Sequence, residues 1–152
     1  IRYPKGTLPA EPGSRRPEIT LGQGYLTREQ EDADTLILAL GICRQKAEEA
    51  ADRLAEQGIR VAVADARFVH LSDAWLARLM GRYRRILTVE DHVGTDGFGA
   101  GIRLQAKEPD RVRVLALPDR FIEQGNREVL LERYKISVCG IMEMVEKWNA
   151  EA

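Results

Sequence analysis

Short apolar runs alternate with amphipathic stretches along most of the chain. Continuous apolar runs are typical of buried strands, and they occur at 35–40, 59–66, 85–90 and 111–117. A weaker candidate strand covers 19–27, where Gly22 and Gly24 interrupt the apolar pattern. The pattern therefore predicts four strong strands and a weak one before them.

Helical periodicity fills the segments between these runs. In the first such segment, Ala47, Ala51 and Leu54 fall on one stripe opposite charged residues, and Gly58 follows as a stop. Ser72 is placed to cap the next helix. The expected helices cover 44–57, about 98–107, 123–134 and 141–149, and the helix after Ser72 is expected to carry Trp75, Leu76, Leu79 and Met80 on its apolar side. Strands and helices that alternate in this way predict an α/β fold with a mainly parallel sheet.

The first residues have a different composition from the rest. Pro4, Pro9, Pro12 and Pro17 remove amide donors and disfavour helix before each proline. We interpret 1–17 as an extended arm, the tail of a preceding domain, and 18–152 as one folded domain.

The charge balance, the length of the apolar runs and the cysteine content limit the classes of function that the chain could have. The chain has 152 residues, with 23 Lys and Arg against 24 Asp and Glu, so its formal charge is -1. This balance gives no case for a nucleic-acid or membrane partner, and no apolar run reaches the ~20 residues of a membrane span. Cys43 and Cys139 lie far apart and predict two reduced, packed thiols without a metal site.

The stretch ILTVEDHVGTDGFGAGI, 86–102, holds the candidate site residues. Its glycines follow the spacing G-x-G-x-G, whereas a dinucleotide site needs G-x-G-x-x-G and an acid at the end of the next strand. A helix that packs closely on the sheet explains Gly97 and Gly99 better. Glu90 and His92 lie where a strand is predicted to end, a position at which proton transfer is possible, but no nucleophile motif accompanies them. We therefore predict Glu90, His92, Gly97 and Gly99 as residues of a subunit or domain junction, and no catalytic residue.

The segment LPDRFIEQGNREVLLERYKIS follows the last strand. Phe121 and Ile122 are expected to anchor it to the core. Its charged residues fall within helical reach of one another and predict exposed ion pairs among Arg120, Glu123, Arg127 and Glu128.

Four stretches in order resemble the end of 1-deoxy-D-xylulose-5-phosphate synthases. They are IRYPKG, ADARFVHLSDAWLARL, RRILTVEDHVGTDGFGAGI and LPDRFIEQGNREVLLERYKISVCGI. The first and last are fairly specific to that enzyme. The glycine-containing third also resembles transketolases and the beta subunits of 2-oxo-acid dehydrogenases, so the resemblance extends to the transketolase C-terminal domain superfamily.

The resemblance implies a three-layer α/β/α sandwich whose five-stranded sheet has its first strand antiparallel to the rest. It also implies a parent transferase, cytoplasmic and dimeric, that uses thiamin diphosphate and Mg to join pyruvate to glyceraldehyde 3-phosphate for isoprenoid synthesis. In that family the cofactor lies between the two preceding domains, so this chain would hold no cofactor and would be inactive alone. It would support the dimer and help close the active site.

One site residue transfers through the resemblance. The basic residue after RYP holds the substrate phosphate in the family, and Lys5 stands there, where arginine is usual, with Arg2 close by in the sequence. Two alternatives stay open: the small chain of a split transketolase, and the C-terminal domain of a 2-oxo-acid dehydrogenase beta subunit.

Overall fold

The computed structural model describes residues 17–151. Its strands are β1 (Tyr25–Arg28), β2 (Thr35–Ala39), β3 (Val61–Asp65), β4 (Arg85–Val93) and β5 (Val112–Leu117). Its helices are α1 (Cys43–Glu56), α2 (Asp73–Arg82), α3 (Phe98–Gln105), the short 3-10 helix η1 (Pro109–Arg111), α4 (Arg127–Arg133) and α5 (Val138–Ala150). The strands form one sheet in the order β1-β3-β2-β4-β5. Only β1 is antiparallel to its neighbour, which confirms the predicted fold class.

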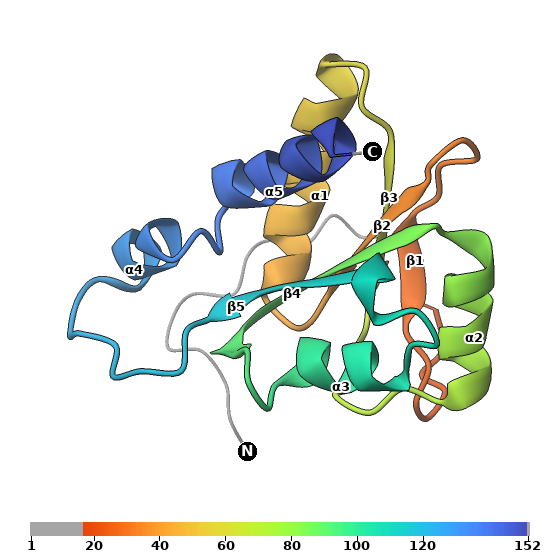
Figure 1. Ribbon diagram of the computed structural model, residues 1–152, viewed down its shortest axis with the longest axis horizontal. Helices are drawn as coiled ribbons and strands as arrows, with labels where there is room; N and C mark the ends of the chain where they lie inside the picture. Colours follow the sequence, from red (N-terminus) through yellow and green to blue (C-terminus); the bar gives the residue numbers. More distant parts are fainter. Residues whose placement is uncertain (1–16, 152) are drawn as a thin grey trace.

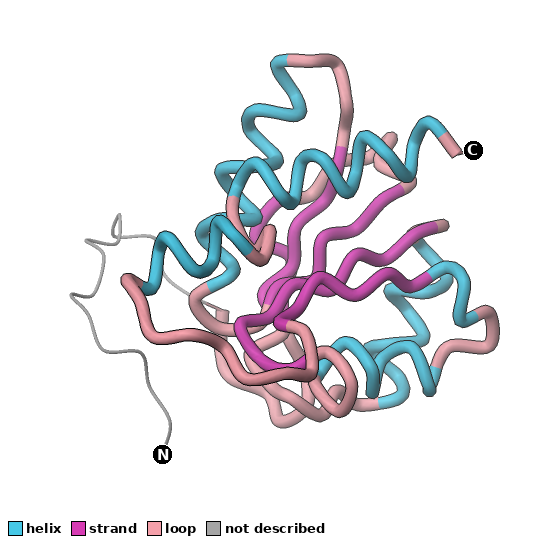
Figure 2. The backbone as a smooth tube through the Cα atoms, turned by 60° about the vertical axis from the view of Figure 1, so that its left-hand side comes forward, coloured by secondary structure: helices cyan, strands magenta, loops and turns pink. Residues whose placement is uncertain are grey.

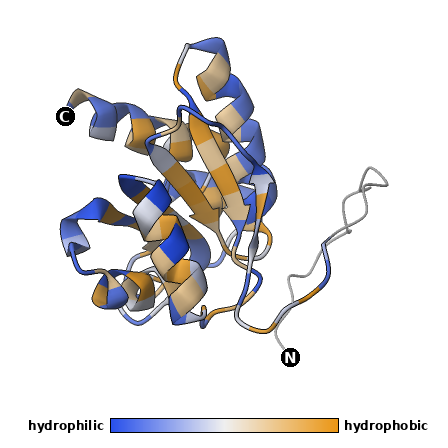
Figure 3. Ribbon diagram, turned by 90° about the vertical axis from the view of Figure 1, so that its right-hand side faces the viewer, coloured by the Kyte–Doolittle hydropathy of each residue, from blue (hydrophilic) through white to orange (hydrophobic). Residues whose placement is uncertain are grey.

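The sheet lies between two layers of helices, as Figures 1 and 2 show. Helices α1 and α5 pack on one face, in a core that contains Ile37, Leu54 and Ile141. Helices α2 and α3 cover the other face, where Leu38, Trp75 and Phe98 are buried. Every residue of β2 is buried, and the apolar strands are visible at the centre of Figure 3. Each face of the sheet therefore has its own hydrophobic core.

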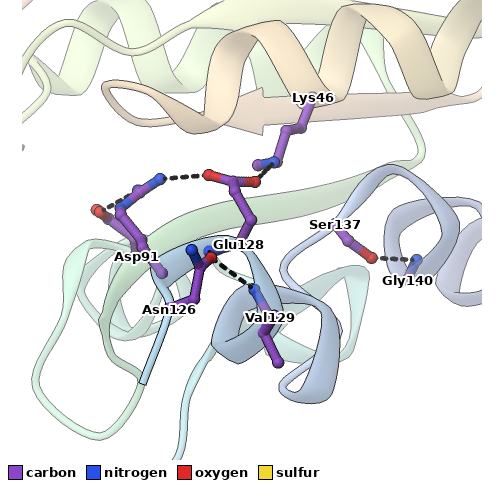
Figure 4. Close-up of polar contacts among 8 residues, drawn as sticks. Lys46, Asp91, Asn126, Glu128, Val129, Ser137 and Gly140 are labelled. Carbon is purple, nitrogen blue, oxygen red and sulfur yellow. Dashed lines mark hydrogen bonds and ion pairs between the residues drawn. The ribbon is translucent and has the colours of Figure 1, made fainter. Parts of the chain in front are cut away.

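Side-chain caps set the start of three helices. The hydroxyl of Ser72 accepts from the Trp75 amide at the start of α2, as the sequence predicted. Asn126 accepts from the first amides of α4, and Ser137 accepts from the Gly140 amide of α5 (Figure 4). These caps satisfy amides that have no partner within their own helix.

Several predicted boundaries were wrong. The strand predicted at 19–27 is confined to Tyr25–Arg28, and the strand predicted to end at Glu90 continues to Val93. The helix predicted from 123 begins at Arg127, after the Asn126 cap, and the last helix begins earlier than predicted, at Val138.

The segment between β5 and α4 also differs from its prediction. Phe121 was expected to anchor this segment to the core, yet its side chain is fully exposed, and Ile122 is only half-buried. The segment runs away from the sheet before α4 begins (Figure 1). Leu131 of α4 instead supplies the core contact.

The expectations about a membrane span and about the two cysteines concern residues that the structure describes. Among residues 17–151, none of the helices combines the length and the hydropathy of a membrane span. Both cysteines are free thiols; Cys43 is buried as predicted, but Cys139 is exposed and not packed.

Candidate functional site at the carboxyl edge of the sheet

The candidate site residues lie beyond the carboxyl ends of the parallel strands. In open α/β sheets this edge is where ligands usually bind. Strands β2, β3 and β4 run in the same direction, so the residues that follow Ala39, Asp65 and Val93 share the edge. Three polar clusters occupy it in the described residues: a buried carboxylate, an ion-pair network and an arginine contact.

The buried carboxylate is that of Glu90, whose residue is 1% exposed. Its Oε2 accepts from the Phe98 amide at 2.9 Å and its Oε1 from the Gly99 amide at 2.7 Å. These amides belong to the first turn of α3, where backbone N–H groups lack helical partners and carry partial positive charge. Glu90 therefore caps α3 across the loop that joins it to β4.

The two predicted junction glycines belong to the same cluster. A Cβ on Gly97 would lie 2.5 Å from Glu90 Oε2, and one on Gly99 would lie 2.7 Å from Val114 Cγ1 of β5. Both glycines are needed because the backbone passes so close to the carboxylate and the sheet. The structure thus brings Glu90, Gly97 and Gly99 together, whereas His92 is exposed on β4. Whether any of them meets a second domain or subunit stays a prediction.

An ion-pair network joins α1, β4 and α4 at the same edge. Figure 4 shows Glu128 between its partners: Arg127 lies 3.0 Å from Asp91 and 3.1 Å from Glu128, and Lys46 lies 2.7 Å from the other Glu128 oxygen. The hydrogen bond from Lys46 holds the pKa of Glu128 below its ordinary value. The network joins α4 to α1 and β4, although ion pairs near the surface contribute only about 0.2–1 kcal/mol each.

The predicted ion pairs after the last strand are only partly present. Arg127 and Glu128 do pair. Glu123 instead accepts hydrogen bonds from Arg133 and from the hydroxyl of Tyr134. The pairing differs because α4 begins after Glu123, so helical spacing does not apply to this residue.

Cys43 begins α1 beneath this network. Its burial raises the pKa of the thiol to about 12, and the Asp91 charge adds to the effect. A thiol with this pKa stays protonated at neutral pH, and the thiolate is the nucleophilic form. Cys43 is therefore a packing residue and not a nucleophile.

The third cluster surrounds Arg67, just after β3. Its backbone has φ +58°, in the left-handed region that residues other than glycine seldom adopt, and its amide donates to Asp65 Oδ1 at 3.0 Å. Its guanidinium donates to the carbonyl oxygens of Glu18 and Pro17, at 3.2 and 3.1 Å. The sequence analysis missed this residue, because arginine gives no signal for a left-handed backbone.

The contacts described above limit the reactions in which the side chains at this edge could take part. The amides of α3 hold the Glu90 carboxylate, and Arg127 pairs with Asp91. Within residues 17–151, no group of His, Cys, Asp and Glu side chains could hold a metal ion. The described contacts hold elements of this chain in place. The predicted phosphate-binding residues, Arg2 and Lys5, lie outside the described residues.

Comparison with known protein families shows which family the chain belongs to. The model of the transketolase C-terminal domain matches residues 24–141. The chain belongs to the transketolase C-terminal domain family. The matched residues run from β1 to the start of α5, so they include the elements that form the carboxyl edge.

Relatives within the family are 1-deoxy-D-xylulose-5-phosphate synthases. The chain is 40% identical over 149 residues to the synthase of Acidobacterium capsulatum, covering 94% of this chain and 23% of the relative. It is 38% identical to the synthase of Aquifex aeolicus, covering 95% of this chain and 23% of the relative. The chain thus spans less than a quarter of the length of these relatives.

Solved structures give the same fold. A split-gene transketolase, described as an inactive beta4 tetramer, has a TM-score of 0.73 and 26% identity over 85% of this chain and 43% of its own. Transketolase from Campylobacter jejuni has a TM-score of 0.63 at 21% identity, covering 83% of this chain and 18% of its own. The second likeness concerns the fold alone.

Proposed function

We propose that this chain is the C-terminal domain of a 1-deoxy-D-xylulose-5-phosphate synthase. The parent enzyme would join pyruvate to glyceraldehyde 3-phosphate with release of carbon dioxide, to supply isoprenoid precursor synthesis. The observation that carries the proposal is the 40% identity to such a synthase over 94% of this chain.

The domain would act by assembly and positioning. His92, which is exposed, would contact a neighbouring domain or subunit, while Glu90, Gly97 and Gly99 would hold the loop before α3 in the shape that the neighbour meets. Arg2 and Lys5 would bring positive charge to the phosphate of the aldehyde substrate. A charge-assisted contact of this kind favours the phosphorylated substrate over its uncharged analogue.

The cofactor would be held elsewhere in the parent protein. Thiamin diphosphate and Mg, bound by the preceding domains, would supply the decarboxylating chemistry, and the residues described here would make no contact with the metal. The parent is proposed to be a cytoplasmic homodimer, whose interface this domain supports. The isolated chain would have no activity.

The proposal is tested with the full-length protein that contains this chain. We expect a cofactor-loaded sample to form 1-deoxy-D-xylulose 5-phosphate from pyruvate and glyceraldehyde 3-phosphate, and the isolated chain to form none. Release of carbon dioxide and product formation would be followed together. An intact, cofactor-loaded assembly that forms no product would refute the proposed activity.

Lys5 gives a second prediction. In the full-length enzyme, Lys5→Ala is expected to raise the KM for glyceraldehyde 3-phosphate by about tenfold, because a charge-assisted contact contributes roughly 1.4 kcal/mol or more. The KM for pyruvate, which has no phosphate, should change little. Steady-state kinetics with each substrate varied in turn measure both constants. Equal effects on the two would remove Lys5 from the phosphate site.

A second candidate function comes from the structural likeness to a split-gene transketolase chain. In this case the chain would be a separately encoded association subunit of a transketolase. Ketose donors would then replace pyruvate as substrates of the assembled enzyme. An assay with xylulose 5-phosphate alongside pyruvate distinguishes the two functions.

A further inference from the structure

A cavity of about 460 Å³ lies at the amino ends of the parallel strands, opposite the candidate functional site. It is bordered by the residues that begin β4 and β5, by η1 and by the end of α5, and the arrows of β4 and β5 in Figure 1 start at this edge. Its volume is within the usual range of small-molecule sites. Because it contains none of the residues of the carboxyl edge, a ligand held here would be additional to that site.

One wall of the cavity is fixed by Arg111 of η1. Its Nε donates to the Arg84 carbonyl oxygen at 2.8 Å, and its Nη2 donates to the carbonyl oxygens of Met80 and Tyr83, both at 2.8 Å. Its Nη1 donates to Glu108 at 3.1 Å. All three nitrogens of the guanidinium are engaged, so Arg111 holds η1 against the end of α2. The wall is formed before any ligand arrives.

The opposite wall carries two arginines that are oriented by α5. Arg113 pairs with Glu151 and lies 4.6 Å from a ring centroid of Trp148. Arg85 lies 5.8 Å from the Trp148 ring and donates to Asn149 Oδ1 at 2.6 Å. A guanidinium has five N–H donors, and within residues 17–151 each of these two makes a single hydrogen bond. Most of their donors therefore remain available beside the cavity.

The carboxylates around the cavity leave two of its arginines without a counter-charge. The three that line it already have arginine partners: Glu108 pairs with Arg111, Asp110 with Arg103 and Glu151 with Arg113. In the part of the chain that the structure describes, no carboxylate pairs with Arg84 or Arg85, although both line the cavity. Arg85 is half-buried, and its partner is a neutral amide. A partly desolvated cation of this kind attracts an anion more strongly than a fully exposed one does.

We propose that this cavity binds the phosphate group of a small phosphate monoester through Arg84, Arg85 and Arg113. A monoester carries close to two negative charges at neutral pH, which matches two guanidiniums that have no carboxylate partner. The planar donors of arginine suit phosphate oxygens, which they bind in pairs. The remaining volume of the cavity leaves room for a small organic group.

The site is tested first by an NMR titration of the chain with methyl phosphate. The titration is made at constant ionic strength and above the second pKa of the ester, about 6. We expect saturable shifts of the Trp148 indole and of the backbone amides of Arg84 and Arg85, with a Kd of about 1 mM. Acetate and dimethyl phosphate each carry one charge, and the latter is a diester like the phosphates of lipids and nucleic acids. Both should bind at least about tenfold more weakly.

Three variants assign the binding to the arginines. Arg85→Gln should raise the Kd for methyl phosphate about tenfold, and Arg85→Lys, which keeps the charge without the planar fork, by about threefold. Arg84→Gln should raise it by about threefold or more, and because Arg84 is exposed this variant keeps the fold. Arg78→Gln is the matched control, since it removes the same charge from an exposed arginine of α2 outside the cavity. Its Kd should stay within about twofold of the original.

The full-length protein that contains this chain is tested by equilibrium dialysis with radiolabelled methyl phosphate. The double variant Arg84→Gln with Arg85→Gln should bind one equivalent less per chain than Arg78→Gln. Equal binding by these two proteins would mean that another part of the parent covers the cavity, and would overturn the proposal. In the titration, a lack of saturation, or equal Kd values for Arg85→Gln and Arg78→Gln, would also overturn it. Dimethyl phosphate binding as tightly as methyl phosphate would overturn the assignment to a monoester. None of these measurements uses the synthase reaction, so they decide the proposal whether or not the proposed function holds.

Discussion

Replacing Gly99 with alanine is expected to lower the free energy of unfolding by about 2 kcal/mol. A Cβ at this position would overlap the Thr88 hydroxyl and would lie 2.7 and 2.9 Å from the two methyl carbons of Val114. Inserting a methyl group into a packed contact of this kind costs about 1–3 kcal/mol or more. The gain in helix propensity from glycine to alanine, about 1 kcal/mol, offsets only part of that loss.

Gly101 provides the matched control in the same helix. A Cβ there would meet nothing within 4 Å, so Gly101→Ala should raise the free energy of unfolding by about 0.5–1 kcal/mol through propensity alone. Urea denaturation of both variants, with the slope m compared between them, measures the difference. Changes of equal sign and size would mean that α3 does not depend on close packing at Gly99.

The central strands were predictable because strands buried on both faces consist of continuous apolar residues. The runs that become β2, β3 and β4 are covered on both faces, and such strands are continuously apolar. The first strand was overextended for a related reason. Apolar Ile19 and Leu21 suggested a longer strand, yet both are exposed, and Gly22 takes φ +70° in a turn that ends the pairing with β3.

The candidate site was harder to predict because its contacts join residues far apart in the sequence. Glu90 could be placed at the end of a strand, but the bonds from its carboxylate to the Phe98 and Gly99 amides follow from the path of the loop and not from any periodicity. The salt bridge between Asp91 and Arg127 spans 36 residues. Arg67 could not be predicted because no local sequence pattern indicates its left-handed backbone. Its amide contacts Asp65, the Phe68 amide closes a turn with the Ala66 carbonyl, and its guanidinium lies over the Tyr25 ring.

Three side chains from different elements each hold a segment at this edge. Glu90 holds the start of α3, Arg127 holds α4 and Arg67 holds the incoming chain, so separate segments are fixed around the ends of the parallel strands. If the proposed function is right, a neighbouring domain meets a surface whose loops are already ordered. Ordered loops lose less conformational entropy on association than flexible loops do.

Glu90→Ala is expected to lower the free energy of unfolding by about 3 kcal/mol, the largest single effect of the residues discussed. The substitution leaves the buried Phe98 and Gly99 amides without an acceptor, and each unsatisfied buried donor costs about 1–3 kcal/mol. Glu90→Gln keeps one acceptor oxygen but turns a donor group toward the other amide, so its loss should be roughly half as large. Urea denaturation of both variants measures the series.

Asp96→Asn separates hydrogen bonding from charge in this prediction. Asp96 is exposed just before α3, so its replacement removes the same unit of charge near the helix start without removing a buried acceptor. Its effect should be below about 1 kcal/mol and should fade with added salt, as for any exposed charge near a helix end. The Glu90 losses should persist in salt, because they arise from buried donors left without partners. A Glu90→Ala loss no larger than that of Asp96→Asn, and equally sensitive to salt, would reduce Glu90 to a surface charge and would leave the α3 cap without an energetic role.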